Sequence, residues 1–190
     1  MSPQPVGVVL AGGAGRRIGG NKALVALDGR PLLHYPLEAL RVVLDDVVVI
    51  CKTDTPLPPL PAPVSIWCEN DPEHHPLIGV AAALREAAGR SILVCAGDMP
   101  LVTPEAVRSL LDAPAATAVV ARAAGRIQPL FARYEPAALV VIEAMDISEP
   151  ATRVVERLEP RIVDLADDDL ALNVNAPEDI LQASALLSRT

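Results

Sequence analysis

Aromatic residues are scarce in this chain. They make up 2% of its 190 residues, whereas 51% of the residues are hydrophobic. The core must therefore be built from alanine, valine, leucine and isoleucine, as is typical of parallel sheets that are buried on both faces. A chain this apolar is not disordered. Its length fits one domain, and we expect residues 1–190 to form a single one.

Cysteines are also few, and they lie far apart. The sequence has three, Cys51, Cys68 and Cys95, and no two of them have the CxxC spacing of redox and zinc motifs. Each lies in or at the end of an apolar run. We therefore expect buried, reduced thiols, as in proteins of the cytoplasm.

The chain lacks an excess of positive charge. Its 16 Lys and Arg against 24 Asp and Glu give a net charge of −8. This excludes a general nucleic-acid binder, which needs a basic face to neutralise phosphates. A site that holds one nucleotide through a few local groups is not excluded.

Long apolar runs are absent as well. No stretch reaches the ~18 residues that a membrane span needs. The apolar N-terminal stretch is too short for a signal peptide and has no basic region before it. We expect a soluble, cytoplasmic protein that binds neither nucleic acid nor a membrane.

What the chain does contain is a regular alternation of strand-like and helix-like segments. The strand-like segments are apolar runs at residues 6–10, 47–51, 64–68, 91–96, 116–121, 127–134, 161–165 and 170–174. The helix-like segments lie at residues 31–43, 77–88, 136–145 and 151–158, and two more begin at Pro104 and Pro177. The alternation predicts an α/β fold, a Rossmann-like, doubly wound, mostly parallel sheet with helices on both faces.

The first strand-like segment runs directly into a glycine-rich stretch, LAGGAGRRIGGNK, at residues 10–22. Glycines let backbone N–H groups approach a phosphate closely, and Arg17 and Lys22 bring positive charge to it. The stretch is not a Walker loop, because Ala23 rather than Ser or Thr follows Lys22. It is not a dinucleotide fingerprint either, because Ile18 stands where the third glycine would be. We expect a phosphate-binding loop of another kind.

Asp98 closes the strand-like segment at residues 91–96. Open α/β sheets bind ligands at the carboxyl ends of their strands, and an acid that faces a phosphate loop there can hold Mg²⁺. The alternative is that Asp98 only caps a turn or a helix. Asn175 has a similar alternative, an Asx turn that caps the last helix.

Four motifs follow one another along nearly the whole chain. They are LAGGAGRRIGG at residues 10–20, CAGDMP at 95–100, QPLFA at 128–132 and NVNAPED at 173–179. Together they resemble the motifs of the molybdenum cofactor guanylyltransferases, the MobA family. The resemblance implies the nucleotidyltransferase type of Rossmann-like fold and Mg²⁺-dependent transfer of GMP from GTP to molybdopterin, with release of pyrophosphate. Whether a protein partner hands over the cofactor is left open.

The same resemblance implies roles for individual residues. The catalytic residues are expected to be Arg17 on the β- and γ-phosphates, Lys22 on the α-phosphate, and Asp98. Asp98 and Asn175 are the expected ligands of Mg²⁺. The residues expected to hold the nucleotide are Leu10, Ala11, Gly12, Gly13, Lys22, Asp71 and Asp98. Glu69 and Asn70 compete with Asp71 for the contact to guanosine.

Three positions depart from the family's pattern. His75 stands where a glycine usually precedes Pro-Leu, which bears on the shape of the base pocket. Asn21 stands where an acid often precedes the lysine. Ala176 replaces the threonine of NVNTPED and removes a hydroxyl that could cap the last helix. The neighbours His74 and His75 cannot both point at one ion from a regular element, so we expect structural or surface roles for them.

Two other interpretations stay open. A related nucleotidyltransferase would use CTP or GTP with another phosphorylated acceptor, such as a sugar phosphate. A regulatory module would bind the nucleotide without catalysis, and it would not need Arg17, Lys22 and Asp98 together.

Overall fold

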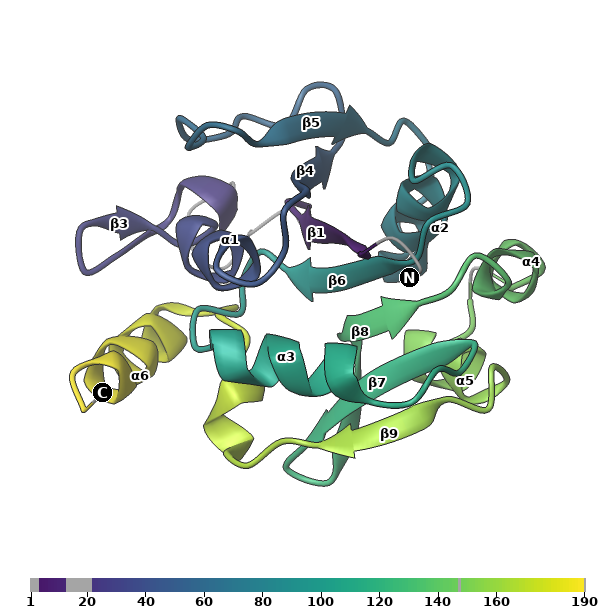
Figure 1. Ribbon diagram of the computed structural model, residues 1–190. Coiled ribbons are helices and arrows are strands. Elements are labelled where there is room, and N and C mark those ends of the chain that lie inside the picture. The colour runs from purple at the N-terminus through teal and green to yellow at the C-terminus, as the bar shows by residue number, and fades with distance from the viewer. Residues whose placement is uncertain (1–3, 13–21, 147, 190) are drawn as a thin grey trace.

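The computed structural model of the protein describes residues 4–12, 22–146 and 148–189. Its centre is a seven-stranded sheet with the order β5-β4-β1-β6-β8-β7-β9 (Figure 1). The strands are β1 (Val6–Leu10), β4 (Val47–Cys51), β5 (Ser65–Cys68), β6 (Ile92–Ala96), β7 (Ala118–Ala123), β8 (Arg126–Tyr134) and β9 (Arg161–Asp164). Of these described strands, only β8 runs against its neighbours β6 and β7, so the predicted mostly parallel sheet is confirmed.

Helices cover both faces of this sheet, as predicted. They are α1 (His34–Arg41), α2 (Pro76–Glu86), α3 (Pro104–Asp112), α4 (Ala138–Glu143) and α5 (Ala151–Glu156), whereas α6 (Pro177–Leu187) packs outside these two layers. Apolar side chains of α1 and α3 pack in one core cluster. Those of α2, α4 and α5 pack in another. Since the strands supply both clusters, the sheet forms the middle layer (Figure 1).

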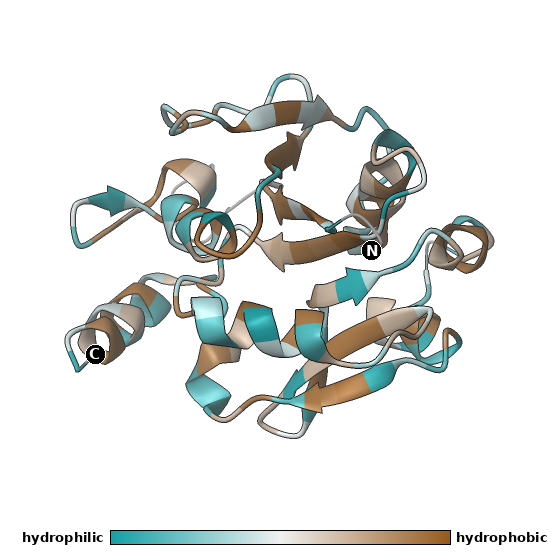
Figure 2. Cartoon of the chain, in the orientation of Figure 1, coloured by the Kyte–Doolittle hydropathy of each residue, from teal (hydrophilic) through white to brown (hydrophobic). Residues whose placement is uncertain are grey.

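The central strands show why their sequence is apolar throughout. In β4, Val47, Val49 and Cys51 face the cluster with α1 and α3, whereas Val48 and Ile50 face the cluster with α2, α4 and α5. Successive residues of a strand point to opposite faces, and both faces are covered here. Figure 2 shows these central strands as predominantly hydrophobic.

Two helices begin where the sequence predicts. The Thr103 side chain accepts a hydrogen bond of 3.2 Å from the N–H of Ala106 and so caps α3. His75 caps α2 in the same manner, because its Nδ1 accepts from the N–H of Leu77 at 3.2 Å. Its Nε2 lies 2.9 Å from the carbonyl oxygen of Glu149. The structural role expected for His75 is therefore confirmed.

The strand predicted at residues 170–174 is wrong. The chain there forms the 3-10 helix η3 (Asp168–Ala171), followed by an irregular segment. The carboxylate of Asp167 accepts a 2.9 Å hydrogen bond from the N–H of Asp169 and starts this turn. Aspartates that bond to their own backbone compete with strand pairing in this way. The apolar residues of this segment therefore do not indicate a strand.

The sequence analysis also missed a short hairpin of β2 (Ala26–Leu27) and β3 (Arg30–Pro31). Its turn residues Asp28 and Gly29 have φ angles of +50° and +76°. These angles fit the Asp-Gly pair, a preferred two-residue hairpin turn. The 3-10 helix η2 (Lys22–Leu24) directly precedes this hairpin.

The hairpin and α6 share a third, smaller core cluster. Leu27 and Leu32 from the first part of the chain pack there with Val174 and Ala183 from the last part. Figure 1 shows α6 beside the carboxyl edge of the sheet, away from the helices of the two main layers. This cluster therefore brings the start of α6 to the strand ends that carry the site.

Cysteine burial is partly as expected. Cys51 and Cys95 are buried, but Cys68 is exposed. The reason is its position in β5, which is an edge strand of the sheet. Within the described ranges, no helix is long and apolar enough to cross a membrane.

The ends of β1 and β6 approach each other closely. The N–H of Gly97 donates to the carbonyl oxygen of Leu10 at 3.0 Å. A Cβ at position 97 would lie 2.9 Å from that oxygen and 2.9 Å from the Cδ1 of Leu33. Only glycine fits at this point, which fixes the backbone immediately before Asp98.

Replacing this glycine tests the close approach. We expect Gly97→Ala to lower the free energy of unfolding by about 1–3 kcal/mol, because the backbone must shift to admit the methyl group. Gly12→Ala is the control, since a Cβ there meets no described heavy atom within 4 Å. Urea unfolding curves of both variants make the comparison. Equal stabilities would show that the approach imposes no such constraint.

Candidate active site

Three segments of the chain meet at the carboxyl edge of the sheet. Asp98 lies two residues after β6, Lys22 begins η2, and Asn175 lies just before α6. A backbone hydrogen bond of 2.9 Å, from the N–H of Val174 to the carbonyl oxygen of Asp98, joins the last segment to the end of β6. The fold thus gathers residues that are far apart in the sequence.

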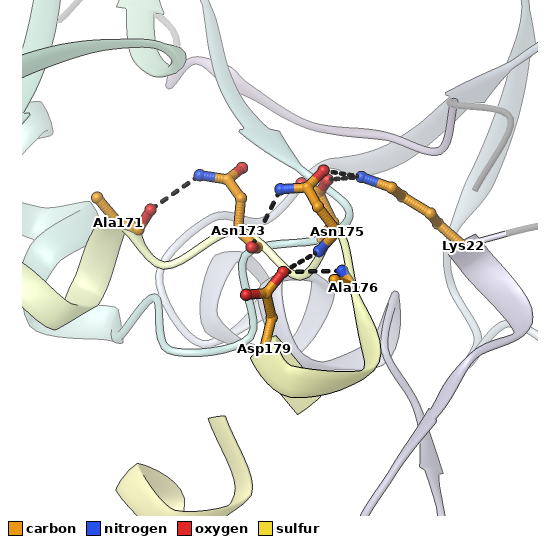
Figure 3. A network of polar contacts seen from close by, with 7 residues as sticks. Lys22, Ala171, Asn173, Asn175, Ala176 and Asp179 are labelled. Atoms are coloured by element: carbon orange, nitrogen blue, oxygen red, sulfur yellow. Dashed lines mark hydrogen bonds and ion pairs between the residues drawn. The ribbon is translucent and has the colours of Figure 1, made fainter. Parts of the chain in front are cut away.

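The ammonium group of Lys22 connects these segments. Its Nζ lies 2.7 Å from the Oδ2 of Asp98, and it also donates a hydrogen bond to the Oδ1 of Asn175 (Figure 3). The side chains of Lys22 and Asp98 are only 16% and 17% exposed, so water screens this pair poorly. The structure therefore brings together three residues that the sequence proposed for catalysis and metal binding.

Asp179 positions Asn175, a role for Asp179 that was not predicted from the sequence. Its carboxylate accepts hydrogen bonds from the N–H groups of Asn175 and Ala176, at 2.7 Å and 2.8 Å (Figure 3). This is one half of a capping box. The other half needs a side-chain oxygen at Ala176, and alanine has none. The Pro-Glu-Asp sequence that begins α6 was the signal that could have indicated this role.

The alternative interpretation was that Asp98 and Asn175 only cap turns or helices. Their side chains have other contacts in the structure. Thr103, not Asp98, caps the next helix, α3. The amide nitrogen of Asn175 donates to the carbonyl oxygen of Asn173 at 3.1 Å, while its oxygen accepts from Lys22. Both oxygen-bearing side chains are thus directed at the ammonium group.

A small pocket lies beside this contact. Its lining includes most of the residues proposed to hold the nucleotide, namely Leu10, Ala11, Gly12, Lys22 and Asp98. Gly13 and Arg17, and also Asn21, lie outside the described residues, so their roles stay predictions.

Asp71 lies in the exposed loop after β5. Lys52 organises this loop, because its ammonium donates to the carbonyl oxygen of Asp71 and lies 3.7 Å from a carboxylate oxygen of Glu69. The side-chain oxygen of Asn70 accepts a 2.6 Å hydrogen bond from the hydroxyl of Thr53. The Asp71 carboxylate accepts a 2.9 Å hydrogen bond from the N–H of Glu73, so all three side chains have partners within the protein, and Asp71 stays the predicted nucleotide contact.

The donor set around Lys22 suits a hard divalent cation. The carboxylate of Asp98 and the amide oxygen of Asn175 converge on one positive group, and both are oxygen ligands. Among the described residues, no group of three or more His, Cys, Asp and Glu could hold a metal by itself. Mg²⁺ commonly binds through one or two protein oxygens plus substrate phosphates and water. The residues present fit such a cation.

A larger surface hollow, of about 390 Å³, lies between α1 and the proline-rich segment at residues 59–61. Its charged groups are already engaged within the protein. Arg30 forms an ion pair with Glu38, the Arg41 guanidinium donates to the carbonyl oxygen of Ala62, and His34 Nε2 lies 3.0 Å from the carbonyl oxygen of Pro59. None of the residues proposed to hold the nucleotide lines this hollow, whereas five of them line the pocket beside Lys22, which is therefore the better candidate for binding phosphates.

Two solved structures resemble this chain in fold. The molybdopterin-guanine dinucleotide biosynthesis protein A of Archaeoglobus fulgidus has a TM-score of 0.73 at 24% identity, covering 97% of this chain and 99% of that one. The 2-C-methyl-D-erythritol 4-phosphate cytidylyltransferase of Thermus thermophilus has a TM-score of 0.68 at 21% identity, covering 98% and 100%. Both structures share the Rossmann-like fold of this chain.

Sequence comparison shows that the chain is a nucleotidyltransferase and also shows its family. The model of the MobA-like NTP transferase domain matches residues 7–162, so the chain belongs to that family. A molybdenum cofactor guanylyltransferase of Cereibacter sphaeroides is 34% identical, covering 96% of this chain and 97% of that protein. One of Ectopseudomonas mendocina (strain ymp) is 32% identical, covering 93% and 90%. The resemblance seen in the motifs is confirmed.

The incomplete cap of α6 generates a prediction. Ala176 has the extended backbone of an N-cap residue, with φ −139° and ψ 162°. We expect Ala176→Thr to raise the free energy of unfolding by about 1 kcal/mol, because its hydroxyl can accept from the N–H of Asp179. Ala176→Val has the same shape without the hydroxyl and should bring no gain. Thermal unfolding of the two variants decides, and identical melting temperatures would exclude a capping effect.

Proposed function

We propose that the chain transfers GMP from GTP to molybdopterin and releases pyrophosphate. The observation that carries the proposal is the contact of Lys22 with Asp98 and Asn175 beside the glycine-rich segment. It supplies a positive group for phosphates and two oxygens for a cation at the ligand-binding edge of the sheet. The names of the relatives, molybdenum cofactor guanylyltransferase, support the choice of nucleotide and acceptor.

The residues act by positioning and by charge. Backbone N–H groups of the glycine-rich segment and the Arg17 guanidinium would bind the β- and γ-phosphates. Lys22 would neutralise charge that develops on the α-phosphate as the acceptor attacks it in line. The acceptor's phosphate oxygen is already ionised at neutral pH, so no general base is needed.

Asp98 and Asn175 would hold Mg²⁺, which would neutralise charge on the phosphate oxygens of the nucleotide. Lys22 now occupies the position on which both oxygens converge. Cation binding there requires the ammonium to leave, and the phosphates of a nucleotide are the groups that would attract it. Lys22 therefore has one partner set without nucleotide and another with it.

The nucleobase and the acceptor are the least constrained parts of the proposal. The likeness to a cytidylyltransferase leaves CTP with another phosphorylated acceptor as the second candidate. Asp71 is the residue proposed to contact guanosine. We further propose that residues 1–190 act as one domain.

A pyrophosphate-release assay with each of the four nucleoside triphosphates tests the function. We expect turnover with GTP only, and only when molybdopterin is present. Asp98→Asn should reduce turnover by about 10²–10³-fold, the effect typical of losing one electrostatic stabiliser. Turnover with CTP, or with GTP only when a sugar phosphate replaces molybdopterin, would favour the second candidate.

Binding of Mn²⁺, followed by electron paramagnetic resonance without nucleotide, tests the role of Lys22. We expect Lys22→Met to raise Mn²⁺ affinity at least about tenfold, because a unit charge about 4 Å away opposes a cation by several kcal/mol near a protein surface. The double variant Lys22→Met/Asp98→Asn should lose this gain. An affinity that does not change in Lys22→Met would show that the ammonium does not compete for the site.

A further inference from the structure

Two cysteines lie side by side at the carboxyl edge of the sheet. Cys51 ends β4 and Cys68 ends β5, and the two residues are paired in the register of these parallel strands. A backbone hydrogen bond of 2.9 Å, from the N–H of Glu69 to the carbonyl oxygen of Cys51, continues the pairing. Paired residues of neighbouring parallel strands direct their side chains to the same face of the sheet. The two thiols therefore share one face.

The spacing of the pair suits a disulfide bond. Neighbouring strands lie about 4.8 Å apart, within the range of roughly 4.4–6.8 Å that the Cα atoms of disulfides span. Among the described strands, β5 lies at the edge of the sheet and pairs with β4 alone, and Cys68 is its last residue. Its backbone can therefore adjust to bring the sulfur atoms together.

The third cysteine is excluded from such a bond. Cys95 lies in β6, and β1 separates β6 from β4. Two strand spacings amount to about 10 Å, beyond the limit of about 7 Å between Cα atoms. Cys95 is also completely buried, with 0% exposure, and burial raises the pKa of its thiol.

The environments of the pair differ. Cys68 is exposed, whereas Cys51 is buried. Burial raises the pKa of the Cys51 thiol, and a charge on Cys68 raises it further, since the two groups are close. A dissolved reagent therefore meets Cys68 first, and Cys51 follows as the second thiol.

We propose that Cys51 and Cys68 form a modification site, a thiol pair that low-molecular-weight disulfides oxidise to an intramolecular disulfide. The Cys68 thiolate attacks one sulfur of the reagent, giving a mixed disulfide and one small thiolate. Cys51, after losing its proton, attacks the Cys68 sulfur and expels the second small thiolate. Two protein thiols are oxidised, and one small disulfide is reduced to two thiols.

The bond would form directly beside the loop that carries Asp71. Lys52 and Glu69 follow the two cysteines in sequence and form the ion pair at the base of this loop. Oxidation would therefore join the end of β5, where this loop begins, to the end of β4.

Peptide mapping of the intact, folded chain tests the proposal. Trypsin separates the three cysteines into the peptides 42–52, 53–85 and 91–108. The protein is incubated with oxidised glutathione, quenched with acid, alkylated in denaturant and digested without reduction. We expect a linked product of peptides 42–52 and 53–85, loss of both their free thiols, and an alkylated thiol in peptide 91–108.

Two variants provide the controls. Cys51→Ser should accumulate glutathione on Cys68, because no second thiol can displace it. Cys68→Ser should keep a free thiol at Cys51, since that residue is buried. The proposal is overturned if the wild-type chain gives only the glutathione adduct seen in Cys51→Ser, keeps both thiols free, or links either peptide to 91–108.

Discussion

One ammonium group makes contact with side chains from two distant parts of the chain. Lys22 contacts Asp98 and Asn175, which lie 76 and 153 positions further along the sequence. The side chains of Lys22 and Asp98 are mostly buried, so the contact holds the three segments in one arrangement. In the proposed function, this is the point at which phosphates and a cation meet the protein.

The sheet fixes the position of the candidate site. β1 and β6 are neighbours, and their ends are joined where Gly97 donates to the carbonyl oxygen of Leu10. The chain can turn toward Asp98 only because no side chain stands between them. From the other side, the small cluster around Leu27 and Val174 places the start of α6. Lys22 thus lies between two anchored segments, and its own position follows from theirs.

The sequence predicts the buried parts of this fold well, because their residues have one consistent environment. β1 and β4 are found at the predicted residues, since strands covered on both faces must be apolar throughout. The segment at 170–174 is also apolar, but the neighbouring Asp167 starts a helical turn instead. The exposure of Cys68 could not be predicted, because apolar content does not reveal that β5 lies at an edge.

The candidate site was also predicted only in part from the sequence. Motifs identified Lys22, Asp98 and Asn175 separately, and the rule for strand ends put the first two at one edge. Lys22 can contact both oxygens only because of where α6 packs. Packing between segments that are far apart in the sequence leaves no local sequence pattern, so this contact could not be predicted. Asp179, which holds Asn175 in place, was missed because it was interpreted only as part of a helix start.

The smallest core cluster has a consequence for the order of events during translation. Leu27 and Leu32 are synthesised early, whereas Val174 and Ala183 follow after every described strand of the main sheet has been made. The β2–β3 hairpin therefore leaves the ribosome long before its packing partners exist. Domains fold as they emerge, so a nascent chain can pair its central strands before α6 packs on the β2–β3 hairpin. The contact of Lys22 with Asn175 cannot form in such an intermediate, so this part of the site is completed only after the start of α6 has been released.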